Sequence, residues 1–342
     1  MRKFLFLFVM ASLVITPALF AQRGGRVGDT IEVKLASPLP KESPWGRTLD
    51  RIASEWSRIT NSQVRLNVRH GGIEGNEKKM QLSLSSDTIQ GAIFTSFGLS
   101  TIYPGIMTLS IPFLIRTENE LNAVLQELQP DLERRFNSGN YFILAWSKSG
   151  FVNIFSKDPV YTPDDLRRIK IASNAEATEM NTVFKTMGFQ VIESDWSEIG
   201  NKLNAGTVSA VYQNPAAIAA VQLQSVLKNM LSVNIAPVMG GIVLNQVTWK
   251  KIGDLNPRYQ KELLDVTRKI ANEFDNSLPK TVEDAVKTMT RSGLKVNQAT
   301  AAQEQLWATE VEKATASLLG SVFDRELYQR INTILTRIRG RR

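Results

Sequence analysis

The residue types that enzymes use most often are scarce in this chain of 342 residues. It contains one histidine, His70, and no cysteine, so zinc sites and histidine-assisted nucleophiles have almost no material. His70 precedes a Gly-Gly turn, where we expect a structural role or a minor cleft contact. The glycines form no dinucleotide fingerprint and no phosphate loop. Two carboxylates can always meet in space, but no spacing favours them as a catalytic pair. We therefore predict no enzyme, no cofactor and no metal site.

One missing charge is the most informative feature of the sequence. Residues 168–172 alternate as a short strand that ends in Ala172. In open α/β sheets, ligands bind beyond the carboxyl ends of the strands. A cationic side chain at Ala172 could have held an acidic ligand, and none is present there.

The segment around Ala172 alternates strands and helices from residue 163 to residue 215. Thr162, followed by Pro and two Asp, is typical of a helix start, and Asn174 is expected to cap the next helix. The strands are predicted at 168–172, 189–192 and 208–213. Such alternation argues for parallel strands with right-handed crossovers, and hence for an α/β fold. A helical pattern over 257–291 would run about 50 Å, long enough to brace two lobes.

The first 21 residues read as a secretory signal peptide. Arg2 and Lys3 precede an apolar run from Phe4 to Ile15, and cleavage is expected after Ala21. An uncleaved anchor is the alternative, but the run is shorter than the roughly 20 residues of a spanning helix. No later run is long enough, so we expect an exported, periplasmic protein. Without cysteine it has no disulfide and no lipid-modified terminus.

The net charge of +8 does not by itself indicate nucleic acid. Lys and Arg are spread along the predicted helices, apart from a cluster at the C-terminus formed by Arg337, Arg339, Arg341 and Arg342. A solvated basic face, or a contact with a membrane surface or a partner protein, is the favoured interpretation.

Several short motifs, taken together in their order, resemble one family. They are Ser43-Pro44-Trp45, the turn Gly71 to Glu77, Ile111 to Leu114, Trp146, Gly150 to Asn153, Thr162 to Leu166, Gly206 to Pro215, and Trp249. Over about residues 30–338 the chain resembles the periplasmic substrate-binding component of tripartite ATP-independent periplasmic (TRAP) transporters, the DctP-like family. None of the motifs is specific alone, whereas their common order and spacing are.

The resemblance implies a two-lobed, type II-like periplasmic binding protein with hinge strands and a long bracing helix. Lobe I would comprise residues 30–149 and about 236–255, and lobe II residues 150–235 and about 256–298. Residues 299–342 would form C-terminal helices. Such proteins close on a small ligand without catalysis and deliver it to TRAP permease membrane subunits. A subset of these proteins works with a periplasmic tetratricopeptide-repeat lipoprotein. Because this chain lacks the acid-binding Arg, it resembles that subset.

The chain departs from the family pattern at the residues that bind organic acids. By position, the Arg that meets the ligand carboxylate is replaced by Ala172. A second family Arg, in a Gly-Phe-Arg-Asn pattern, is replaced by Val152. An acidic position corresponds to Tyr212, and a ligand-facing aromatic position corresponds to Trp196.

These departures predict a cleft for an apolar or amphipathic ligand. Moving an ion from water into a closed cleft without a partner costs several kcal/mol of desolvation free energy. A bidentate Arg–carboxylate contact contributes about 1.5–3 kcal/mol to binding. We expect Ala172, Val152, Trp196 and Tyr212 to line the cleft, with Asn214 and Glu77 as polar anchors. Trp196 and Tyr212 could instead be core residues, as large aromatics often are.

Two other functions stay open. Arg168 or Lys170 shares a strand face with Ala172 by period two, and either could bind an organic acid as a substitute cation. Alternatively, the ligand site is lost and the protein is an adaptor that binds a partner protein.

Overall fold

The computed structural model describes residues 30–340, so the predicted signal peptide lies outside the described residues. The strands are β1 Ile31–Ala36, β2 Val64–Arg69, β3 Gly91–Thr95, β4 Tyr141–Ser156, β5 Lys170–Asn174, β6 Gln190–Ser194, β7 Ala210–Gln213, β8 Asn229–Leu231, β9 Ala236–Asn245 and β10 Lys295–Asn297. The helices are α1 Pro44–Ile59, α2 Glu77–Ser85, α3 Ser96–Ser100, η1 Pro104–Ser110, α4 Glu118–Ser138, α5 Pro163–Arg167, α6 Thr178–Thr186, α7 Trp196–Asn204, α8 Pro215–Ala220, η2 Leu223–Ser225, α9 Gln246–Leu255, α10 Pro257–Arg291, α11 Ala301–Leu318 and α12 Arg325–Arg339.

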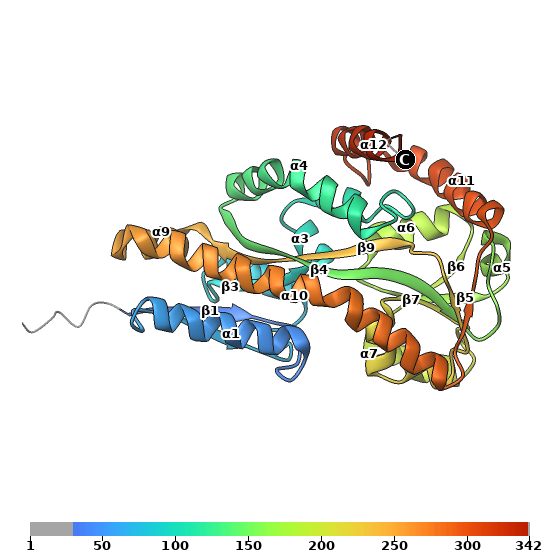
Figure 1. The fold of residues 1–342 in the computed structure, drawn as a ribbon, viewed down its shortest axis with the longest axis horizontal. Helices are drawn as coiled ribbons and strands as arrows, with labels where there is room; N and C mark the ends of the chain where they lie inside the picture. The colour runs from blue at the N-terminus through green and yellow to red at the C-terminus, as the bar shows by residue number, and fades with distance from the viewer. Residues whose placement is uncertain (1–29, 341–342) are drawn as a thin grey trace, which may run out of the picture.

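The strands form a sheet in the order β2-β1-β3-β9-β4-β7-β5-β6 (Figure 1). We call the part built on β1, β2 and β3 the first lobe, and the part built on β5, β6 and β7 the second lobe. Within each lobe these strands are parallel. The predicted α/β class and the alternation of strands and helices in the second lobe are confirmed.

Two long strands join the lobes. The strand β4 is antiparallel to β9 and, at its far end, antiparallel to β7. Its register with β9 shifts between Lys148 and Phe151, where Gly150 has a φ of +80° that favours glycine. A β-bulge of this kind bends a strand, so β4 changes direction between the lobes.

Local predictions at the helix starts hold at Thr162 and fail at Asn174. The Thr162 side chain accepts a hydrogen bond from the Asp165 amide, and the Asp165 carboxylate accepts one from the Thr162 amide, which forms a capping box. Asn174 instead closes a turn by accepting from the Glu176 amide at 3.0 Å. The helix α6 begins only at Thr178, because residues 175–177 make a loop at the end of β5.

The helix α10 has the predicted bounds and packs along both lobes (Figure 1). In the first lobe, the indole Nε1 of Trp56 donates to Thr267 Oγ1 at 2.9 Å in a fully buried contact. At the strand that joins the lobes, Asp275 Oδ1 accepts from the Lys148 amide at 3.1 Å. The same helix then reaches α8 of the second lobe.

Asp275 makes the stability of this contact dependent on pH. The carboxyl is buried, and burial raises its pKa from 3.8 to about 6, against the lowering effect of the Lys148 amide and charge. The folded state then holds a proton that the unfolded state releases between these values. The free energy of unfolding therefore falls as pH rises from 4 to 7. The difference between the folded and the unfolded pKa of Asp275 corresponds to a loss of up to about 3 kcal/mol. We expect Asp275→Asn to remove this fall, because an amide does not ionise.

Urea unfolding of both proteins at pH 4 and pH 7, followed by Trp fluorescence, checks this expectation. The Asp284→Asn variant is the control on the same helix. The Asp284 carboxylate is exposed and paired with Lys280, which lowers the pKa of Asp284. The free energy of unfolding of this variant should therefore be slightly lower than that of the wild type at pH 7. Equal pH dependence in wild type and Asp275→Asn would rule out the buried-carboxyl explanation.

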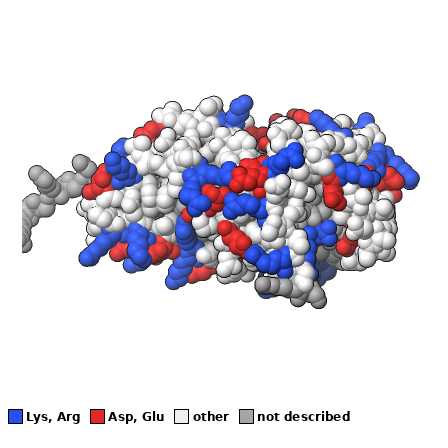
Figure 2. All heavy atoms as spheres, turned by 90° about the horizontal axis from the view of Figure 1, so that it is seen from above, with Lys and Arg blue, Asp and Glu red and all other residues white. Residues whose placement is uncertain are grey.

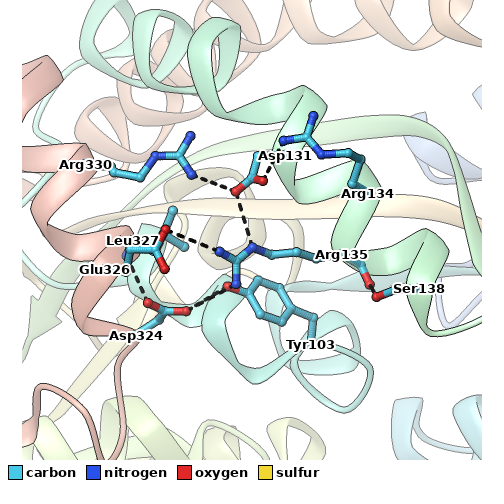
Figure 3. Close-up of polar contacts among 9 residues, drawn as sticks. All are labelled: Tyr103, Asp131, Arg134, Arg135, Ser138, Asp324, Glu326, Leu327 and Arg330. Carbon is cyan, nitrogen blue, oxygen red and sulfur yellow. Dashed lines mark hydrogen bonds and ion pairs between the residues drawn. The ribbon is translucent and has the colours of Figure 1, made fainter.

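The C-terminal helices contact both lobes. The helix α11 packs on α5 and α6, and α12 packs on α4 and η1. In Figure 3, Asp131 of α4 accepts from Arg330 of α12 at 2.7 Å and from Arg134 and Arg135 of its own helix. The Tyr103 hydroxyl donates to Asp324 at 3.0 Å on the other side of Arg135. This network fixes α12 against α4 of the first lobe.

Charged side chains of both signs are interspersed on the face that carries α4, α11 and α12 (Figure 2). Within the C-terminal basic cluster, Arg337 pairs with Glu127 and Arg339 with Glu120 of α4. Arg339 thus meets a buried carboxylate, whereas Arg337 and Glu127 stay about half-exposed, so a solvated or partner-binding role of the basic cluster stays a prediction. No helix in residues 30–340 has the length and apolar character needed to cross a membrane.

Candidate functional site

A cavity of about 410 Å³ lies where the carboxyl ends of strands from both lobes meet. From the first lobe it is lined by the segments that follow β1, β3 and the turn after β2. From the second lobe it is lined by the segments that follow β5, β6 and β7. Segments beyond strand ends carry irregular backbone and free side chains, so this is the position at which an open α/β sheet binds ligands.

Ala172 and Val152 both line this cavity. Ala172 is 1% exposed, lies on β5 between Ile192 and Val211, and packs with Ile199 of α7. Val152 is 5% exposed and lies on β4 just beyond the bulge. The two positions at which the sequence lacks an arginine therefore form apolar wall.

The two predicted aromatic residues line the same cavity. Trp196 is the first residue of α7 and is partly buried. Tyr212 lies on β7, and its ring meets the Phe184 ring edge-on at 5.1 Å between centroids. Burial raises the pKa of the Tyr212 hydroxyl, so this group is neutral at physiological pH. The Tyr212 hydroxyl makes no hydrogen bond to another described residue. It can therefore donate to or accept from a ligand.

Glu77 lines the cavity, but its carboxylate is already occupied. It accepts from the Thr95 amide, the Thr95 hydroxyl and the Gly98 amide, each at 2.7 Å. Gly98 must stay small, because a Cβ there would lie 2.3 Å from the Phe94 ring and 2.8 Å from Glu77 Oε2. Burial raises the pKa of Glu77 while these three donors lower it. Glu77 thus joins α2 to β3 and α3 instead of presenting a free anchor.

Asn214 is placed outside the cavity lining. Its amide nitrogen donates to the carbonyls of Ser149 and Phe151 at 2.5 and 3.1 Å, and its Oδ1 caps α8 through the Ala216 amide. The Asn-Pro pair is therefore a helix start that fixes the bulge of β4. His70 is likewise structural, with Nε2 2.8 Å from Asp50 Oδ1.

No Lys or Arg side chain from the described part of the chain lines the cavity. Arg168 and Lys170 are exposed and lie at the opposite end of β5 from the cavity. The acidic side chains in the lining are Glu77 and Glu176. An organic acid would therefore enter a site with carboxylates and no cation, which opposes its binding.

The sequence analysis missed Glu176 and Ser173. Both lie at or just after the end of β5 and line the cavity. The strand β5 runs to Asn174, so the predicted strand end at Ala172 is two residues early, and Ser173 and Glu176 lie nearer the observed end. A carboxylate and a hydroxyl at a strand end are common in sequences, so the residue types alone do not mark Glu176 and Ser173.

The model of the bacterial extracellular solute-binding protein family 7, DctP, matches residues 35–320. The chain belongs to this family. A curated relative of this family-7 chain is the 2,3-diketo-L-gulonate-binding periplasmic protein YiaO of Escherichia coli K12. The two are 22% identical over 239 residues, which is 69% of this chain and 72% of YiaO.

Solved structures of TRAP periplasmic solute-binding proteins share the fold of this family-7 chain. The protein from Desulfovibrio salexigens, with bound orotic acid, has a TM-score of 0.79 at 19% identity, covering 90% of this chain and 100% of that protein. The protein from Ralstonia eutropha H16, with bound (S)-2-acetolactate, has a TM-score of 0.80 at 18% identity, covering 89% and 99%. The predicted two-lobed solute-binding fold is therefore confirmed.

Membership of family 7 makes the chain a solute-binding protein and not an enzyme. No group of three His, Cys, Asp or Glu side chains within residues 30–340 is placed to hold a metal ion. Within residues 30–340, the cavity of this family-7 chain is lined by no Lys or Arg.

Proposed function

We propose that this chain captures an apolar or amphipathic small ligand between its lobes, outside the cytoplasm, and delivers it to a TRAP permease. The observation that carries the proposal is the cavity lining. Ala172 and Val152 close its wall, Trp196 and Tyr212 add aromatic faces, and no Lys or Arg of residues 30–340 lines it. Burying apolar surface in such a cavity contributes about 25 cal/mol per Å² of ligand.

The organic-acid alternative loses its support in the same lining. It requires Arg168 or Lys170 to reach the ligand, and both side chains are exposed at the far end of β5. The family relatives bind acids such as orotic acid and D-glucuronate. We propose that this chain kept their architecture and changed the ligand class.

The proposed lobe boundaries follow the joining strands. The division at residues 149 and 150 falls at the bulge of β4, and the return to lobe I at about residue 236 coincides with the start of β9. Residues 236–255 then hold β9 and α9, and about 256–298 hold α10 and β10. The helices of residues 299–342 contact both lobes, so they would have to slide on one lobe during closure.

We also propose periplasmic location through a cleaved signal peptide at residues 1–21. A periplasmic tetratricopeptide-repeat lipoprotein is proposed as a second partner, on the ground that both acid-binding arginines are replaced. Cross-linking in intact cells followed by mass spectrometry should recover permease subunits and this lipoprotein. Recovery of the permease alone would reject the second partner.

Closure on ligand separates a transport protein from an adaptor. We expect solution scattering to give a smaller radius of gyration after incubation with a lipid extract of the source cells, because ligand contacts made only in the closed state shift the hinge equilibrium. An extract of water-soluble acids should leave the radius unchanged. An adaptor would show no change with any extract and an affinity for its partner that ignores ligand.

A further inference from the structure

We propose that the cavity binds the protonated amine of an amphipathic ligand at Glu176, with Ser173 and Trp196 beside it. This inference rests on the proposed function and adds the chemistry of the ligand's polar end. The starting point is that the cavity contains one carboxylate with nothing bound to it. Glu176 lies in the loop between β5 and α6, where it lines the cavity and is exposed to solvent. No hydrogen bond or ion pair to its carboxylate is found within residues 30–340.

A second carboxylate strengthens the negative field at this end of the cavity. Asp195 follows the end of β6, the strand beside β5, and its side chain makes no capping hydrogen bond to α7. It is exposed and lies outside the cavity lining, so it acts on Glu176 through its charge alone. Burial and the nearby charge of Asp195 raise the pKa of Glu176. Two like charges that no cation separates repel each other, and a bound cation removes that repulsion.

Ser173 supplies an independent sign of a missing ligand group. The residue is 2% exposed, lines the cavity, and its Oγ has no hydrogen-bond partner. Buried hydroxyls are normally paired, because an unpaired one loses the hydrogen bonds that it makes with water in the unfolded chain. The Oγ lone pairs can accept from an ammonium N–H that also contacts Glu176.

Trp196 completes the site with an aromatic face. It directly follows Asp195 and lines the cavity, with Tyr212 and Phe97 as further aromatic walls. A cation held over an indole is attracted by the ring quadrupole, most strongly when water is excluded. The same walls suit the apolar body of the ligand, so one cavity serves both ends of an amphiphile.

Three octyl compounds test the inference, since they share one chain and differ in the head group. Octylamine is a cation at pH 7, octan-1-ol is neutral and octanoate is an anion. Titration calorimetry of the wild-type protein should rank them amine, alcohol, acid in order of affinity. Glu176→Gln should lower the affinity for octylamine about tenfold, because a charge-assisted contact becomes neutral, and leave octan-1-ol within twofold. Glu179→Gln, on α6 and outside the cavity lining, is the matched control and should change neither.

The outcomes separate this inference from the proposed function. If octylamine and octan-1-ol bind equally and more tightly than octanoate, the amine site is wrong and the apolar cavity stands. An equal loss of both ligands in Glu176→Gln also rejects the amine site. If octanoate binds most tightly, or if no octyl compound binds, both the apolar cavity and the amine site are overturned.

Discussion

Ala172→Arg is expected to lower the affinity for the natural ligand by about 100-fold or more. The new guanidinium would enter an apolar wall that holds no carboxylate partner except Glu176, and it would occupy volume that the ligand needs. Burying a charge against an apolar ligand costs several kcal/mol, and each 1.4 kcal/mol is a factor of ten. The same change should give measurable binding of D-glucuronate, because Arg pairs with carboxylates in bidentate geometry.

Ala172→Met is the matched control for this prediction. It adds bulk of similar length without charge, so it should weaken ligand binding less and should not create affinity for D-glucuronate. Val152→Arg places an arginine in the same cavity wall from β4. This variant replaces Ala172→Arg if crowding against Ile199 prevents Ala172→Arg from folding. Titration calorimetry measures the affinity of each variant for the natural ligand and for D-glucuronate. Wild-type affinity for simple dicarboxylates or uronates in the micromolar range or tighter would show that the polarity assigned to the cavity is wrong.

Glu77→Ala is expected to lower the free energy of unfolding by about 3–5 kcal/mol. The substitution removes the acceptor of three hydrogen bonds and leaves the Thr95 and Gly98 amides buried without partners. Each such orphan costs about 1–3 kcal/mol, and the loss is larger when the partner was charged. The first lobe would lose the contact that fixes α3 and the cavity wall next to Phe97.

Urea unfolding at pH 7, with Trp fluorescence as the signal, measures this loss. Glu74→Ala is the control in the same turn. Its carboxylate forms an ion pair with the partly exposed Arg69 at 3.3 Å, so a change below about 1 kcal/mol is expected. If Glu77→Ala unfolds with the same free energy as wild type and loses only ligand affinity, Glu77 is a ligand anchor after all.

The sequence predicted those parts of the fold that local patterns determine. The alternating module around Ala172, the capping box at Thr162 and the bounds of α10 all depend on periodicity and caps, which are local. Asn174 misled because Asn forms both helix caps and turns, and the contacts of α6 decide between them. Residues 141–156 form one strand with a bulge at Gly150, which depends on pairing with β9 and β7 and not on a local pattern.

The position of the cavity could be predicted from the ends of the strands. Which polar side chains are free to bind a ligand could not be predicted, because distant backbone groups also form hydrogen bonds with them. Ala172, Val152, Trp196 and Tyr212 line the cavity, and their contact with a ligand stays a prediction. Glu77 and Asn214 are polar residues near the cavity, but amides and carbonyls distant in the sequence occupy their side chains. Only tertiary structure shows which polar groups are occupied and which, like Glu176 and Ser173, stay free.

Mass spectrometry of the ligand that co-purifies with the undenatured protein tests the central claim most directly. The claim is that this chain shares its fold with proteins that bind organic acids, whereas its cavity is lined by no Lys or Arg of residues 30–340. The predicted result is a stoichiometric small molecule with an apolar body, and with an amine at its polar end if the Glu176 site is correct. A uronate, a dicarboxylate or another organic acid in stoichiometric amount would contradict the account.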